Sequence, residues 1–167
     1  IAASYAFTAI PARFVLERQQ WAEAAALESK LPDNYPIEKF PAMEAITYFA
    51  RAMGAARSGN VNMANQALEK LTALNKKAGE TSAYWAKQVE ILRLSSLAWI
   101  MYQEGGKEEA LNVMQNAAEL ESSTEKHPVT PGEILPAREL LADMLLDMGR
   151  YREAQTEYET ALNRSPN

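Results

Sequence analysis

The stretch that decides the fold lies at the end of the chain, where Leu135 to Asn167 reads LPARELLADMLLDMGRYREAQTEYETALNRSPN. Apolar and small side chains recur in it every three or four residues, with polar residues between them, as in amphipathic helices. Gly149 divides the stretch at a place where a glycine can take the left-handed conformation that ends a helix. Pro166 follows the second half, and proline cannot continue a helix. The pattern therefore predicts two short helices joined by a tight turn.

Small and aromatic residues alternate along these two helices. The small ones allow two helix backbones to approach closely, and the aromatic ones fill the space that remains between them. In chain order, the small, turn, aromatic and closing positions are Ala142, Gly149, Tyr151, Ala154, Tyr158, Ala161 and Pro166. This order resembles the tetratricopeptide repeat (TPR), a helix–turn–helix unit of about 34 residues. Arg138 departs from the family pattern, which has a tryptophan at that position.

Weaker copies of the pattern precede the last one. The anchor alanines are Ala24, Ala64, Ala110 and Ala154, which are 40, 46 and 44 residues apart. Because these spacings exceed the TPR period, we expect inserted loops or extended helices between the units. The expected units cover about residues 2–30, 42–76, 82–123 and 131–165. Gln19 stands where the first unit should have its turn glycine, and Leu71 replaces an alanine in the second.

The resemblance implies an all-α fold: a right-handed α-solenoid of TPR-like antiparallel helix pairs, in a single domain over residues 1–167. The last part, from Val129 to Asn167, is also similar to the C-terminal end of bacterial TPR proteins of unassigned function. Because the chain starts at Ile1 rather than at a methionine, we expect it to be a piece of a longer protein.

A proline-rich segment interrupts the helical pattern after the first unit. Residues 31–41 contain three prolines together with Asp33 and Asn34, which predicts a loop or extended segment. Its apolar residues Tyr35, Ile37 and Phe40 are expected to hold it to the helical core.

Prolines also affect where two helices begin. Pro11 is expected to bend or start a helix near the N-terminus. Residues 130–133 have the form of a capping box, which predicts that the first helix of the last unit begins near Pro131. Pro136 would then kink this helix, and the alternative is that the helix begins only at Leu135.

Length and composition exclude several classes of protein. A chain of 167 residues can bury roughly 70% of its unfolded surface and needs no covalent cross-link to fold. Cysteine is absent, so neither a disulfide framework nor thiolate chemistry is available. The net charge of −5 disfavours nucleic acid and anionic lipid as partners. No apolar run approaches the ~18 residues that span a bilayer, so we expect no membrane partner.

Catalytic and cofactor-binding motifs are scarce. His127 is the sole histidine and precedes a proline in an expected loop, where a solvated role is favoured. Gly105 and Gly106 end a helix and do not form a phosphate-binding loop. The sequence has no His/Cys cluster for zinc. We therefore expect no enzyme activity, no cofactor and no dedicated metal site.

Three carboxylates follow one another along the first helix of the last unit. Glu139, Asp143 and Asp147 are spaced at i, i+4 and i+8, which places them on one helical face. Such a ladder could hold a divalent cation or bind a basic peptide. The favoured interpretation is a solvated acidic face, because repulsion at this spacing costs only a few tenths of a kcal/mol per pair.

The resemblance also implies a binding surface. In TPR-like stacks the first helices of the pairs line the concave face, where partners often lie. The corresponding residues here are Arg13, Glu17, Phe49, Met53, Arg57, Ser95, Trp99, Tyr102, Gln103, Glu139, Asp143 and Asp147. They imply a groove with an aromatic middle and an acidic end, suited to a basic or amphipathic peptide. The alternative is that loops fill the groove and the aromatic residues belong to the core.

The sequence thus favours a protein–protein interaction scaffold that binds a peptide or protein segment on its concave face. The lysines and asparagines with which chaperone-tail-binding TPRs clamp a carboxylate are missing, so that ligand is not expected. The alternative function is structural: homo-oligomeric self-association, or docking within a longer repeat protein. Terminal helices that expose an apolar side would favour this alternative.

Overall fold

The computed structural model describes residues 2–124 and 133–164, and within these ranges the chain is helical with no β-strand. The all-α prediction is therefore confirmed for the described residues. The α-helices are α1 (Ala2–Glu17), α2 (Trp21–Ala25), α3 (Pro41–Arg57), α4 (Val61–Gly79), α5 (Ala83–Gln103), α6 (Lys107–Ser122), α7 (Ala137–Asp147) and α8 (Tyr151–Arg164). A short 3-10 helix, Ile37–Lys39, precedes α3.

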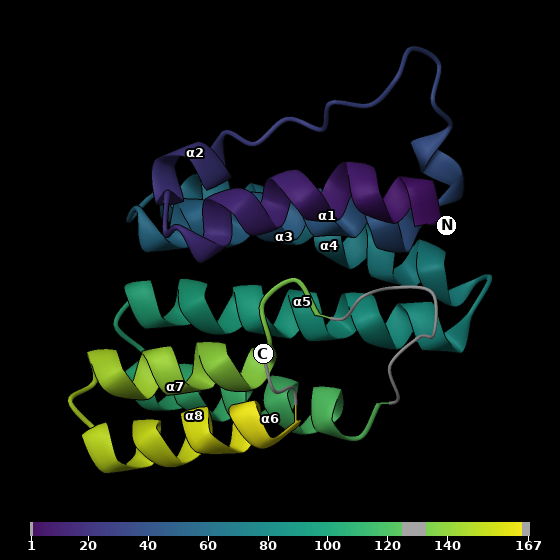
Figure 1. Ribbon diagram of the computed structural model, residues 1–167. Helices are drawn as coiled ribbons and strands as arrows, with labels where there is room; N and C mark the ends of the chain where they lie inside the picture. Colours follow the sequence, from purple (N-terminus) through teal and green to yellow (C-terminus); the bar gives the residue numbers. More distant parts are fainter. Residues whose placement is uncertain (1, 125–132, 165–167) are drawn as a thin grey trace.

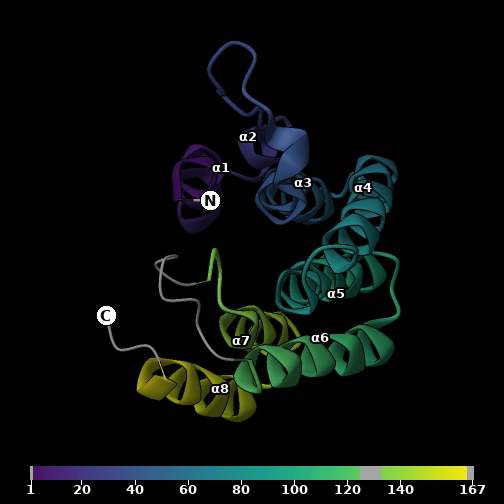
Figure 2. The same ribbon diagram turned by 90° about the vertical axis from the view of Figure 1, so that its right-hand side faces the viewer.

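The helices follow one another along an arc in chain order (Figures 1 and 2). Each helix packs against the next one in the chain, and α1 also packs against α3, α3 against α5, and α5 against α7. Figure 2 shows α1, α3, α5 and α7 on the inner side of the arc and α4, α6 and α8 on its outer side. Helices α3 and α5 lie in the middle of this arrangement, with neighbours on several sides.

The turns between α1 and α2, α3 and α4, α5 and α6, and α7 and α8 share one backbone conformation. Gly59, Gly105 and Gly149 have φ angles of 77°, 96° and 75°, in the left-handed region that glycine takes with least strain. The prediction that Gly149 ends a helix is therefore confirmed. Gln19 occupies the same place between α1 and α2, with φ of 54°. The first turn thus keeps the geometry of the others with a residue that is strained there.

Small residues lie where the helices approach most closely. The anchor alanines Ala24, Ala64, Ala110 and Ala154 are all buried. A very close approach also occurs at Gly54 in the last turn of α3, where an added Cβ would lie 2.3 Å from the backbone nitrogen of Ala25. The backbone of α2 therefore rests directly on α3, which the alanine pattern did not predict.

The proline-rich segment between α2 and α3 is non-helical except for its 3-10 turn, as expected. Its Tyr35 hydroxyl lies 2.7 Å from the hydroxyl of Ser4, and its ring meets Phe7 edge-on at 5.5 Å between centroids. Ile37 and Phe40 pack against the hydrophobic core. The prediction that these three residues hold the segment to the helices is therefore confirmed.

The start of α7 corrects one prediction. Residues 130–132 lie outside the described residues, but residues 133–136 are not helical and α7 begins at Ala137. A start near Pro131 is therefore wrong, and the alternative start at Leu135 is closer to the structure. Proline disfavours helical backbone in the residue before it, which favours a start at or after Pro136, and Pro136 is the residue directly before α7. Buried Glu121 of α6 accepts the Ala137 N–H at 3.0 Å and so caps α7.

Pro11 lies in the interior of α1, so the alternative that it starts a helix is wrong.

Candidate functional site

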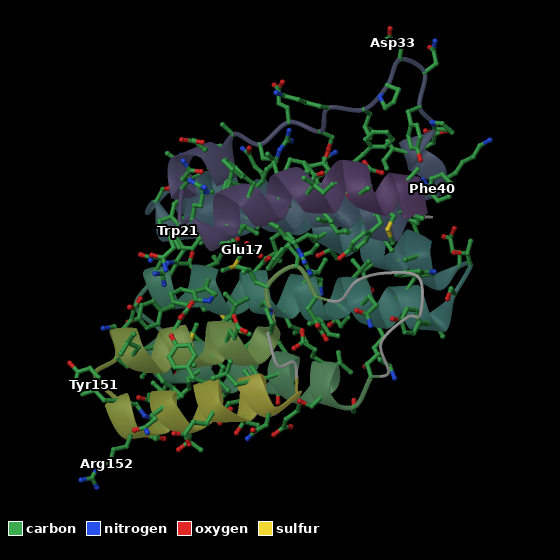
Figure 3. All side chains as sticks on the ribbon, in the orientation of Figure 1. Glu17, Trp21, Asp33, Phe40, Tyr151 and Arg152 are labelled. Carbon is green, nitrogen blue, oxygen red and sulfur yellow. The ribbon has the colours of Figure 1, made fainter. Side chains whose placement is uncertain are left out.

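The inner side of the arc carries a cluster of aromatic and charged residues around Arg57, which ends α3. Its guanidinium lies between two indole rings, 5.0 Å from the centroid of Trp21 and 4.1 Å from that of Trp99. One terminal nitrogen also bonds to Asp147 of α7 at 3.0 Å. Arg57 therefore connects α2, α3, α5 and α7 through one side chain. Figure 3 shows Trp21 on the side of the first pair that faces α5.

The expected aromatic middle of the groove is not accessible. Phe49 and Met53 are 0% exposed and Trp99 is 1% exposed, and Ser95 is also buried. The expectation that these four residues line an open groove is wrong. They belong to the core, as in the alternative interpretation of the sequence. The reason is that α3 and α5 are the central helices, and their inner faces are covered by neighbours on both sides.

Tyr102 and Gln103, at the end of α5, are more accessible. Tyr102 is partly buried, packs edge-on against Trp99 at 5.4 Å, and lies beneath the Lys107 ammonium at 5.3 Å. Gln103 is exposed. These two residues extend the Arg57 cluster toward the turn between α5 and α6.

The acidic end of the expected groove consists of carboxylates that lie close to one another. The pKa of Glu139 is raised, first by burial and then by the nearby charges of Asp143, Glu133 and Glu17. Glu17 belongs to α1, and in Figure 3 it lies on the side of that helix facing α5 and α7. The charge of a carboxylate on α1 therefore acts on Glu139 of α7 across the inner side.

Asp143 is held by a different set of contacts. It accepts a short hydrogen bond from the Tyr158 hydroxyl of α8. Burial raises its pKa, while the bond from Tyr158 and the charge of Arg57 oppose that rise. Burial together with the hydrogen bond to Asp143 raises the pKa of Tyr158. Asp147 is thus paired with an arginine and Asp143 with a hydroxyl. Among the contacts that the structure describes, Glu139 has neither kind of partner to compensate its charge.

The segment before α7 covers part of the inner side. One terminal nitrogen of Arg13, on α1, donates to the backbone carbonyl of Glu133. Ile134 of the same segment is buried. Arg13, expected at the groove, therefore links α1 to this segment.

The acidic ladder is not arranged as a metal site. Within the ranges 2–124 and 133–164, no group of three or more His, Asp or Glu side chains is close enough together to hold a metal ion. Asp147 is occupied by Arg57 and Asp143 by Tyr158. His127 lies outside the described residues.

Sequence reasoning missed three residues of this surface. Trp21 and Tyr158 were interpreted only as packing residues, although one stacks on Arg57 and the other bonds to Asp143. Glu133 was placed in a capping box, although its charge helps to raise the pKa of Glu139. The partners of Trp21 and Tyr158 lie 36 and 15 residues away in the sequence, so no local pattern could have indicated these two contacts.

Comparisons with known proteins found no matching family model, no matching curated protein and no matching solved structure. Among the described residues, no helix is both long and apolar enough to cross a membrane.

Proposed function

We propose that this chain is a TPR-like helical-repeat scaffold, a right-handed solenoid of helix pairs, whose inner side binds a basic or amphipathic segment of a protein partner. The proposed role is binding rather than catalysis.

The repeat interpretation is supported by features that recur from pair to pair. Each turn within a pair contains one residue with positive φ, either a glycine or Gln19. Each second helix has its anchor alanine buried. Contacts between α1 and α3, α3 and α5, and α5 and α7 link successive pairs in chain order. Stacked helix pairs of this kind bury a continuous core and leave an extended inner surface.

The proposal that the partner is basic rests on the environment of Glu139. Its carboxylate is partly desolvated and lies in the field of Asp143, Glu133 and Glu17, so its charged form is disfavoured. A lysine or arginine from a partner would reverse this, because an opposite charge nearby stabilises the ionised carboxylate. Apolar residues of the same partner would meet Tyr102 and the edge of the Arg57 cluster. An amphipathic helix or extended basic segment provides both kinds of contact.

The test is a fluorescence-anisotropy titration with a labelled amphipathic peptide that carries lysines along its polar face. We expect saturable binding that weakens as salt is raised, because charge pairs of this type are screened. A peptide with glutamates in place of the lysines should not bind. Glu139→Gln should weaken binding of the basic peptide by roughly two- to fivefold.

Glu119→Gln is the matched control, because it removes one exposed carboxylate from the outer helix α6 with the same change of net charge. It should leave the affinity unchanged. Equal weakening by both variants would show that only net charge matters, and absence of binding by the lysine peptide would contradict the proposal.

Self-association is the second candidate function, and one observation favours it. Ile10 and Phe14 are 68% and 53% exposed and stand one turn apart on α1. Together they form an apolar strip on a helix at one end of the arc. Light scattering over a dilution series tests this role: a concentration-dependent dimer that Phe14→Gln abolishes would support it, and a strict monomer at high concentration would contradict it.

A further inference from the structure

A surface pocket lies away from the inner side of the arc. It has a volume of about 460 Å³ and is formed by the end of α2, by α3 and by the first half of α4. Helices α1, α5 and α7 contribute nothing to it. Its volume falls in the range of about 300–1,000 Å³ that is typical of small-molecule sites. The residues that give it chemical character are Glu28, Tyr48, Arg51, Met63, Gln66 and Lys70.

Arg51 is the partly buried cation at the base of this pocket. Its Nε donates to the Leu27 carbonyl at 2.6 Å, and its guanidinium lies over the Tyr48 ring at 5.3 Å. The first contact caps the chain as it leaves α2, and the two together fix the plane of the guanidinium. Neither contact uses the two terminal nitrogens, which carry the remaining donors of the fork. A guanidinium group whose plane is fixed can bind a carboxylate through two parallel hydrogen bonds.

Arg51 differs from four of the other partly buried arginines of this chain. Arg57, Arg93, Arg138 and Arg150 each form an ion pair with a carboxylate. Arg51 forms none with any carboxylate in the part of the chain that the structure describes. Removing a cation partly from water without a counter-charge is unfavourable, so an anion entering the pocket would be stabilised there.

The other residues that line the pocket limit the kind of anion that it can bind. Lys70 and Gln66 stand one turn apart on α4 and add a second positive charge and an amide donor. Met63 is 40% exposed and offers an apolar surface, as does the Tyr48 ring. Glu28 lines the same pocket and opposes a second negative charge on the ligand.

From these features we propose that the pocket binds a small monocarboxylate with a short apolar tail. The carboxylate pairs with the terminal nitrogens of Arg51, assisted by Lys70, and the tail lies against Met63 and Tyr48. Glu28 makes a phosphate dianion a poorer ligand. This site is separate from the proposed inner surface and does not depend on it.

Hexanoate, hexan-1-ol and hexyl phosphate are the probes, because they share one tail and differ in the head group. Each is titrated into the ¹⁵N-labelled chain while the amides of Leu27 and Ala67 and the Nε–H of Arg51 are followed by NMR. We expect saturable shifts with hexanoate at a dissociation constant of roughly 1 mM. Hexanol should bind at least about tenfold more weakly, because it cannot use the charged fork.

Lys70→Gln should weaken hexanoate binding by roughly two- to fivefold. Lys76→Gln is its matched control, since it makes the same charge change at an exposed position on the same helix outside the pocket. Arg51→Leu should remove hexanoate binding. If this variant is less stable than the parent, the comparison of Lys70→Gln with Lys76→Gln still tests whether hexanoate binds in this pocket. Three results would overturn the proposal: no saturable shift with hexanoate, equal affinity for hexanol, or equal weakening by the two lysine variants. Tighter binding of hexyl phosphate would overturn the choice of a carboxylate.

Discussion

The first pair of neighbouring helices, α1 and α2, and the last, α7 and α8, are both joined by a turn with a positive φ angle, but they are built differently. In the last pair, α7 and α8 have 11 and 14 residues and meet at a turn where Gly149 has φ of 75°. In the first pair, α1 has 16 residues, α2 only 5, and the turn holds Gln19 at φ of 54°. The short α2 is not stable by its own length, because isolated helices of this size are unfavourable in water.

The difference shows where each pair takes its stability from. The last pair buries its own alanines and pairs Tyr158 with Asp143 inside the unit. The first pair depends on the next unit: Gly54 of α3 lets the α2 backbone lie directly upon it, and Arg57 of α3 stacks on Trp21. The following variants test this contrast, from the largest expected effect to the smallest.

Gly54→Ala should destabilise the chain by about 3 kcal/mol. The added Cβ would lie 2.3 Å from the nitrogen of Ala25 and 2.5 Å from the carbonyl oxygen of Trp21, and backbone atoms cannot move aside as side chains do. Urea unfolding followed by circular dichroism measures the effect. Gly79→Ala is the control: its Cβ would meet only Ala86 Cβ at 3.7 Å, so stability should be unchanged or slightly higher. Equal stability of both variants would contradict the close contact between α2 and α3.

Arg57→Met should lower the free energy of unfolding by about 2 kcal/mol, through loss of two ring contacts and one ion pair. The ion pair contributes the smaller share, because the Asp147 side chain is 44% exposed and solvent weakens its charge. The measurement is urea unfolding followed by tryptophan fluorescence, which reports on the rings that touch Arg57. Arg152→Met, an exposed position at the start of α8 that points away from the helices in Figure 3, should cost less than about 0.5 kcal/mol. Similar losses in both variants would mean that the cluster does not connect the two ends of the arc.

Exchanging the turn residues should have opposite effects in the two pairs. Gln19→Gly should raise the melting temperature, by a gain of about 1 kcal/mol, and Gly149→Gln should lower it by a similar free energy. Both positions have positive φ, where a side chain carries strain that glycine avoids. Gln155→Gly, at an exposed position inside α8, serves as the control and should destabilise by about 1 kcal/mol. If Gln19→Gly behaved like Gln155→Gly, the first turn would not have the conformation described.

The smallest expected effect concerns pH. Because the folded chain raises the pKa of Glu139, the folded state keeps this proton to higher pH than the unfolded chain does. The contribution of Glu139 to stability is therefore fully present below about pH 4, the unfolded value, and is lost as pH rises through the folded pKa. Glu139→Gln should be more stable than the parent at pH 7 by about 0.5 kcal/mol or less, and no more stable below about pH 4.

Thermal unfolding at both pH values measures this difference, with Glu119→Gln as the control. If Glu139→Gln raises stability and lowers peptide affinity, Glu139 contributes to binding and not to the stability of the fold. A variant that is less stable than the parent at pH 7 would show that the Glu139 carboxylate is satisfied within the fold.

The candidate surface was predictable only in part. The acidic ladder could be placed on one face because i, i+4 spacing fixes that face whatever the helix packs against. Arg57 was expected on the inner side, but its partners come from α2, α5 and α7. Phe49, Met53 and Trp99 were expected at the groove and are buried, because periodicity gives the direction of a side chain and not what covers it.

The sequence by itself determined the helical class, the turn glycines and the buried alanines, since these follow from short-range geometry: a helical period, a left-handed turn and the size of a side chain. It also indicated that Tyr35, Ile37 and Phe40 hold their segment to the core. Only the tertiary structure decided that Gly54 receives the backbone of α2, that Glu121 caps α7, and that Arg51 lines a pocket and pairs with no carboxylate among residues 2–124 and 133–164. Each of these depends on residues that are 16 or more positions apart or on the absence of a neighbour, and packing in three dimensions alone brings such groups together.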